Sequence, residues 1–102
     1  MFKINGIRWT VKITSPINPV FMTDRGNMTV GVCDNQSKTI YLANTLKGKE
    51  LKKVLCHEIV HATMFSYGVS LNYEQEELFA NILAIHGQEI MDITNKIYKR
   101  LR

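Results

Sequence analysis

Two histidines and a glutamate lie close together in the segment VLCHEIVHA, residues 54–62. His57 and His61 are four residues apart, so on a helix both imidazoles lie on one face, about one turn apart. Two neutral imidazoles in this arrangement can bind a single Zn²⁺. Glu58 follows His57 directly, and from there it can reach a zinc-activated water as a general base without being a ligand. The spacing therefore predicts a zinc-dependent hydrolase.

The third metal ligand is expected on a second predicted helix. A catalytic zinc ion usually has three protein ligands and one open position for water. The extended pattern HExxHxxGxxH is excluded, because Met64 and Tyr67 occupy the positions of its glycine and third histidine. A hairpin of two helices would bring the start of the second one back beside His61. Three acids occur there: Glu74, Glu76 and Glu77.

Glu77 is the best candidate among these acids. It shares a helical stripe with Ala80, Asn81 and Ala84, and the two alanines would let the helices approach closely enough for the carboxylate to reach the metal. Glu74 lies one turn earlier on a similar face and is the runner-up, whereas Glu76 is about a quarter-turn off. Asn81 is a candidate for a hydrogen bond that orients a ligand.

The remaining histidine, His86, is not expected at the metal. It lies about 13 Å beyond Glu77 along the same helix and on the other side of it. We therefore interpret His86 as a surface histidine or a hydrogen-bonded core histidine.

Two helices must position these side chains. Apolar residues recur at helical spacing from about residue 48 to residue 67, and Gly68 is a natural helix stop. A second helix is predicted after Asn72, which can cap it together with Gln75. Its apolar positions continue toward the C-terminus: Leu78, Ile82, Ile85, Ile93 and Ile97.

The first part of the chain predicts strands. Asn5-Gly6 is a turn signal before an alternating run at residues 7–13, and a loop with both prolines follows at residues 15–27. Residues 28–33 and 38–44 predict a second hairpin. The sequence thus favours an α+β fold, with a small antiparallel sheet followed by two packed α-helices. If the strand at residues 39–42 is an edge strand beside the catalytic helix, an extended peptide could pair with it.

Composition narrows the class of protein. The chain has 102 residues, 45% hydrophobic and 22% charged, which predicts one small globular domain over residues 1–102. The start lacks an apolar signal region, no run could cross a membrane, and the two cysteines form no CxxC motif. We therefore expect a cytoplasmic protein without a membrane partner. The net charge of +4 gathers in the tail KIYKRLR, which we interpret as a solvated helix end rather than a direct nucleic-acid contact.

The motifs together resemble a known family. A strand KTIYLAN, a helix with VLCHEIVHA and a second helix with EELFAN are similar to compact zinc peptidases of the ImmA/IrrE type, within the HExxH-plus-glutamate (gluzincin) group. Small phage and mobile-element proteins of that kind are similar too. The resemblance covers roughly residues 28–90 and is most specific at His57–His61. Larger members carry Glu-Ala-Asn-x-Phe-Ala, whereas here Ala80 and Asn81 follow Glu77 by three and four residues, so Glu74 stays open as the ligand.

The resemblance implies a minimal zincin-like metallopeptidase domain. It implies Zn²⁺ as cofactor, with His57, His61 and Glu77 as ligands and Glu58 as general base. In larger members the activity can be directed at a transcriptional repressor, so the expected partner is a protein or peptide substrate. Two other functions remain open at this stage. They are a non-catalytic zinc-binding regulatory or interaction module on the same scaffold, and a nucleic-acid-associated regulator that uses the basic tail.

Overall fold

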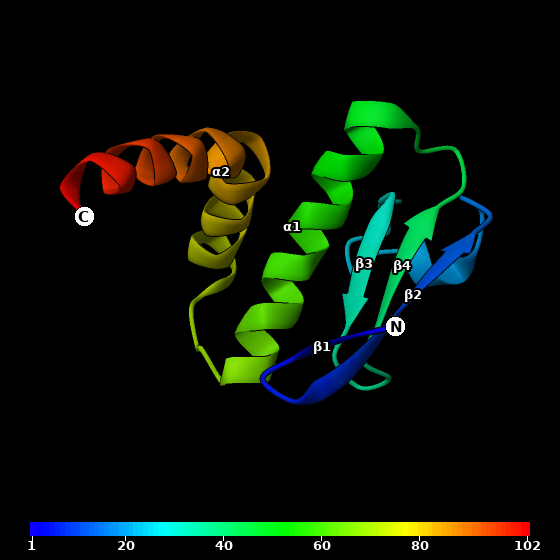
Figure 1. The fold of residues 1–102 in the computed structure, drawn as a ribbon. Coiled ribbons are helices and arrows are strands. Elements are labelled where there is room, and N and C mark those ends of the chain that lie inside the picture. Colours follow the sequence, from blue (N-terminus) through cyan, green and yellow to red (C-terminus); the bar gives the residue numbers. More distant parts are fainter.

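The computed structural model describes residues 1–102 and consists of a four-stranded sheet followed by two long helices (Figure 1). This confirms the predicted α+β class. A single turn of 3₁₀ helix, η1, interrupts the loop that connects the second and third strands. In chain order the elements are β1 (Phe2–Ile4), β2 (Ile7–Thr14), η1 (Pro19–Phe21), β3 (Gly31–Asp34), β4 (Thr39–Ala43), α1 (Gly48–Tyr67) and α2 (Tyr73–Leu101).

The sheet is mixed, whereas an antiparallel sheet was predicted. The two predicted hairpins are present, with β1 antiparallel to β2 and β3 antiparallel to β4. They join through β2 and β4, which run parallel with Thr10 opposite Thr39 and Thr14 opposite Ala43. Parallel neighbours need a connection of a dozen or more residues, and the loop after β2 together with β3 supplies it. Local alternation of apolar residues carries no information about this pairing.

The strand order also differs from the prediction in which strand lies at the edge of the sheet. The order is β1-β2-β4-β3, so β4 lies between two neighbours and β3 is an edge strand. The expectation that residues 39–42 could be an edge strand is therefore wrong. The side chains of β4 agree with its central position, because Ile40 and Leu42 are fully buried.

Local signals at the ends of the elements are confirmed. Asn5 and Gly6 both have positive φ, at 50° and 76°, as a type I′ turn requires. Gly68 ends α1 in the left-handed conformation, and its N–H bonds back to carbonyls of the last turn. Asn72 and Gln75 form the predicted capping box at the start of α2.

Helix α1 lies between the sheet and the first turns of α2 (Figure 1). On one side it packs against the main core, in which Trp9 is fully buried and donates a hydrogen bond from Nε1 to Ser66 Oγ at 2.8 Å. On the other side Val60 and Met64 pack against Ala80 of α2. This central helix carries the HExxH residues, so packing on both sides holds them in place. None of the helices combines the length and apolarity that crossing a bilayer requires.

Candidate metal centre

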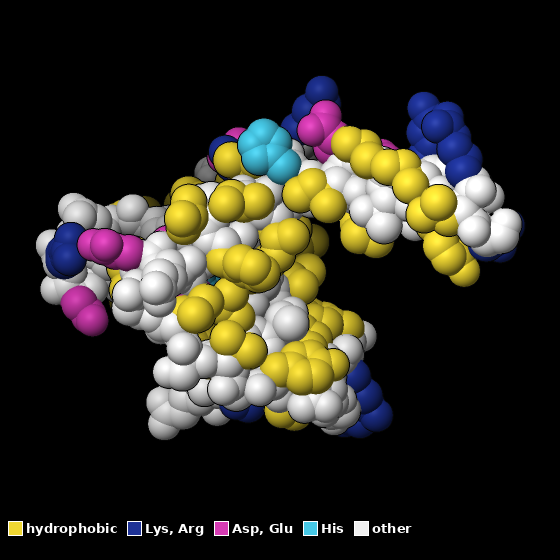
Figure 2. Space-filling model, turned by 90° about the vertical axis from the view of Figure 1, so that its left-hand side faces the viewer, with side chains coloured by type: hydrophobic (Ala, Val, Ile, Leu, Met, Phe, Trp, Pro, Cys, Tyr) yellow, Lys and Arg dark blue, Asp and Glu magenta, His cyan; other side chains and the backbone are white.

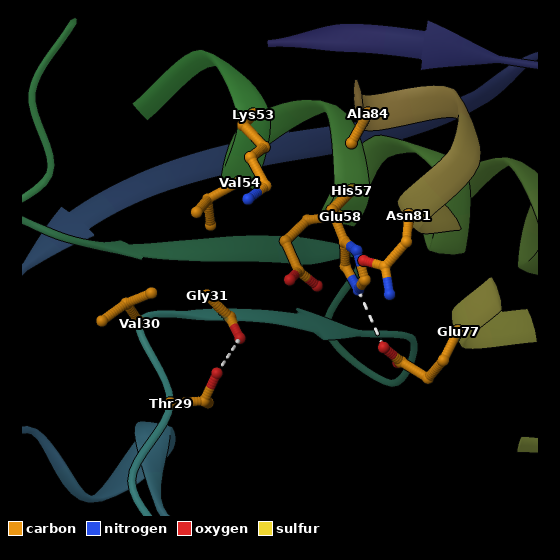
Figure 3. Close-up of a pocket in the computed structure, with 10 residues that line it drawn as sticks. All are labelled: Thr29, Val30, Gly31, Lys53, Val54, His57, Glu58, Glu77, Asn81 and Ala84. Carbon is orange, nitrogen blue, oxygen red and sulfur yellow. Dashed lines mark hydrogen bonds and ion pairs between the residues drawn. The ribbon is translucent and has the colours of Figure 1, made fainter. Parts of the chain in front are cut away.

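Three side chains from the two helices converge on one point. His57 Nε2 lies 3.1 Å from Glu77 Oε2, and His61 Nε2 lies 3.1 Å from Glu77 Oε1. The Nε2 atoms of the two histidines are also 3.1 Å apart. The three residues form a His-His-Glu group that could hold a metal ion. Figure 3 shows His57 on α1 facing Glu77 on α2.

The geometry of this group fits a small tetrahedral ion. With metal–ligand bonds of about 2.0–2.1 Å, the ligand atoms of a tetrahedral site lie roughly 3.3–3.4 Å from one another. The observed separations of 3.1 Å are close to this value, so little movement would be needed to admit an ion. Two imidazoles and one carboxylate also form the donor set of a catalytic site with an open fourth position.

The structure distinguishes between the acids and histidines considered as third ligand. Glu77 belongs to the converging group, and Asn81 and Ala84 of its predicted stripe line the same pocket. Glu74 is exposed in the first turn of α2 and lies outside the group. His86 is exposed farther along α2, as the surface interpretation expects. Ala80, fully buried against α1, permits the close approach of the two helices that Glu77 needs.

Glu58 is buried beside the converging group, with only 7% of its surface exposed. Burial raises the pKa of its carboxyl from 4.5 to about 7, with a further upward contribution from Glu77 and an opposing one from His61. A carboxyl with a pKa near the working pH can both accept and release a proton, which is what a general base that later acts as an acid must do.

Gly31 of the edge strand makes room for Glu58. A Cβ at this position would lie 2.7 Å from Val54 Cγ1 and 3.0 Å from Glu58 Oε2, so any side chain would displace the carboxylate or its neighbour. Gly31 was not among the residues predicted at the site. A glycine inside a strand pattern is a signal for such close approach, because it weakens the strand and needs another reason to be there.

A comparison with protein families agrees with this arrangement. A peptidase family model described as the IrrE N-terminal-like domain matches residues 17–91, a range that includes η1, the HExxH helix and Glu77. The chain belongs to this family. Neither the curated proteins nor the solved structures contain a significant match. Membership confirms the resemblance found from the motifs and assigns the chain to a class of peptidase-type hydrolase domains.

Glu76 contributes to this IrrE N-terminal-like site in a way that the sequence did not indicate. Its Oε1 lies 2.6 Å from His61 Nδ1, and both side chains are largely buried. When Nδ1–H of His61 donates to this carboxylate, the lone pair of Nε2 is left free and directed at the metal position. Glu76 is offset from Glu77 by about a quarter-turn of helix, which counted against it as a ligand. Because of this offset Glu76 contacts Nδ1 of His61 while Glu77 contacts Nε2 of the same ring.

Removing this contact is expected to weaken metal binding. Glu76→Ala should lower the affinity for Zn²⁺ by about 10–100-fold, because His61 loses the group that fixes its tautomer and orientation. A competition titration against a chromogenic chelator measures the change. Glu74→Ala is the matched control, since it removes the same charge from the same helical turn at an exposed position. Equal affinities for the two variants would contradict the assignment.

The pocket over the site lies between the edge strand and the two helices. Thr29, Val30 and Gly31 form one side, and His57 and Glu58 come from α1, as Figure 3 shows. The α2 side consists of Glu77, Asn81 and Ala84. A second hollow shares Glu58 and Glu77 with this pocket and is also lined by His61, Cys33 and Tyr73. Residues of β3 therefore line both hollows, Gly31 the first and Cys33 the second.

Cys33 borders this hollow but does not belong to the converging group. Burial raises the pKa of its thiol to about 12, and the carboxylates of Glu58 and Asp34 act in the same direction. The thiol therefore stays protonated at neutral pH, whereas a nucleophile must be a thiolate.

Proposed function

We propose that the chain is a zinc-dependent endopeptidase that hydrolyses a peptide bond in a regulatory protein. The observation that carries the proposal is the convergence of His57, His61 and Glu77 beside the buried carboxyl of Glu58. Membership of a peptidase family supports the same chemistry. The substrate class, a transcriptional repressor, follows from the resemblance to ImmA/IrrE-type proteins, whose larger members can act on such regulators.

Each residue has a separate task in the proposed reaction. His57, His61 and Glu77 would hold the zinc ion. When bound, zinc acts as a Lewis acid that polarises the scissile carbonyl and lowers the pKa of a water molecule. Glu58 takes the proton of the attacking water and delivers it to the nitrogen of the leaving amine.

The edge strand β3 is the proposed docking site for the substrate backbone. A free strand edge can pair with an extended peptide through main-chain hydrogen bonds. Gly31 of β3 is in contact range of Glu58, so a peptide on this edge would run directly past the general base. This assignment replaces β4, which is covered on both sides by neighbouring strands.

Removal of the metal tests the proposal. The chain is stripped with a chelator, reloaded with zinc and incubated with candidate repressor proteins, and intact mass spectrometry follows the fragments. We expect cleavage at a single bond with the loaded chain, none with the stripped chain, and recovery with about one equivalent of zinc. Full cleavage by the metal-free chain would refute the mechanism. Zinc and repressor binding without cleavage would instead identify a non-catalytic module.

A further inference from the structure

The second half of α2 has almost no contact with the rest of the molecule. Ala80 is the only buried residue of this helix, and Leu83 is its last residue to pack against a core cluster. In Figure 1 the helix bends and its C-terminal half points away from α1. The radius of gyration is 15.1 Å, above the roughly 13 Å of a compact domain of this length. The segment 86–101, called the arm below, is therefore a projecting helix.

The arm carries an exposed apolar stripe. Ile90, Ile93 and Ile97 are 46%, 52% and 47% exposed, although isoleucine is normally a core residue. With His86 they follow alternating steps of four and three residues, which is the spacing of a helix that pairs with another helix. Figure 2 shows hydrophobic side chains along this projecting part and Lys or Arg side chains at its end. Such a contiguous apolar surface indicates a partner.

The residues beside the stripe specify how a partner helix would run. Glu89 and Lys96 lie on one side, seven residues apart, and the small residues Gly87 and Thr94 lie on the other. In an antiparallel pair with Ile90 opposite Ile93 of a second copy, Glu89 of each chain lies opposite Lys96 of the other. The pair thus gains two symmetric ion pairs, and the small residues allow the helices to approach.

A parallel pair of two copies fits less well. His86 and Arg100 would each oppose their own copies, and Glu89 would face Thr94 instead of a cation. An anionic membrane surface also fits less well, because one acid, Glu89, flanks the apolar stripe and another, Asp92, lies among the cations of the polar side. The charges are complementary to a second copy of the same helix in the antiparallel direction.

We propose that the arm is a self-association surface, which pairs antiparallel with the arm of a second copy. In the register above, residues 86–97 of the two arms face each other over about 18 Å of helix. The inference is independent of the proposed function, since it uses no residue of the metal centre. The two-fold axis passes between Met91 and Asp92, so each catalytic unit would lie at an opposite end of the paired arms.

Sedimentation equilibrium over concentrations of about 1–200 µM tests the proposal. We expect a monomer–dimer equilibrium for the unaltered chain and a loss of dimer affinity of at least about 100-fold for Ile93→Lys, which introduces two charges at the centre of the pair. Glu89→Lys and Lys96→Glu should each weaken the dimer by about 10-fold, because like charges then face each other. The double exchange Glu89→Lys with Lys96→Glu should restore it.

Asp92→Lys is the matched control, since it makes the same charge change on the outer side of the arm and should leave the dimer intact. Circular dichroism checks that each variant keeps its helices. A chain that stays monomeric throughout the range would overturn the proposal. It would also be overturned if the double exchange failed to restore the dimer, or if the monomeric chain bound anionic vesicles through Ile93.

Discussion

Replacing Glu58 by glutamine is expected to lower kcat for peptide cleavage by about 10²–10⁴-fold while the chain keeps one metal ion. The amide has nearly the same shape as the carboxyl but cannot accept the proton of the attacking water. Metal binding should persist, because the converging group consists of His57, His61 and Glu77. Cleavage rates and metal content are measured on the same preparation.

The matched control is Glu50→Gln, which makes the same change at an exposed position in the first turn of α1. It should cleave at the unaltered rate. A Glu58→Gln variant with unaltered activity would remove Glu58 from the mechanism. A loss of activity matched by a loss of metal would show that Glu58 acts as a structural support of the site instead.

The same variant should be more stable than the unaltered chain when both are free of metal at pH 8. Folding raises the pKa of Glu58 from 4.5 to about 7, so the folded state disfavours the ionised carboxyl. The resulting penalty is absent below about pH 4.5, grows as the pH rises, and is complete above about pH 7. Glutamine cannot ionise and so avoids this penalty. The free energy of unfolding of Glu58→Gln should therefore exceed that of the unaltered chain by about 1–3 kcal/mol at pH 8 and by almost nothing at pH 4. Urea unfolding with a chelator present measures both values.

Replacing Glu77 by alanine is expected to lower the affinity for Zn²⁺ by well over 100-fold, beyond the effect of Glu76→Ala. Glu77 supplies the only carboxylate in the group, and its two oxygens face His57 and His61 at 3.1 Å. Loss of this ligand leaves two imidazoles, which are too few for a stable site with an open position. Competition titration and metal content after dialysis provide the measurement, and peptidase activity should disappear with the metal.

The exposed Glu74 provides the comparison, because the sequence left it open as the alternative ligand. Glu74→Ala should bind zinc as the unaltered chain does, so the three substitutions rank Glu77 above Glu76 and Glu76 above Glu74. The assignment fails if Glu74→Ala loses the metal and Glu77→Ala retains it.

The sequence alone determined the features that depend on neighbours along the chain. Helical spacing predicted α1 and the common face of His57 and His61, because four residues make about one turn in any helix. The glycine stop at Gly68 and the capping box at Asn72 are likewise local, since their hydrogen bonds join residues a few positions apart. The short link between them indicated a helical hairpin and thereby an acid of α2 near the metal.

Only the tertiary structure decided which atoms meet across elements. Whether Glu74, Glu76 or Glu77 reaches the histidines depends on how closely and at what angle α2 crosses α1, and the buried Ala80 sets that approach. The parallel pairing of β2 with β4, which makes β3 the edge strand, depends on the path of the loop after β2 and is independent of apolar alternation. The burial of Glu58 against Gly31 depends on both the packing of α2 on α1 and the position of β3 in the sheet. The carboxyl lies where β3, α1 and α2 come together.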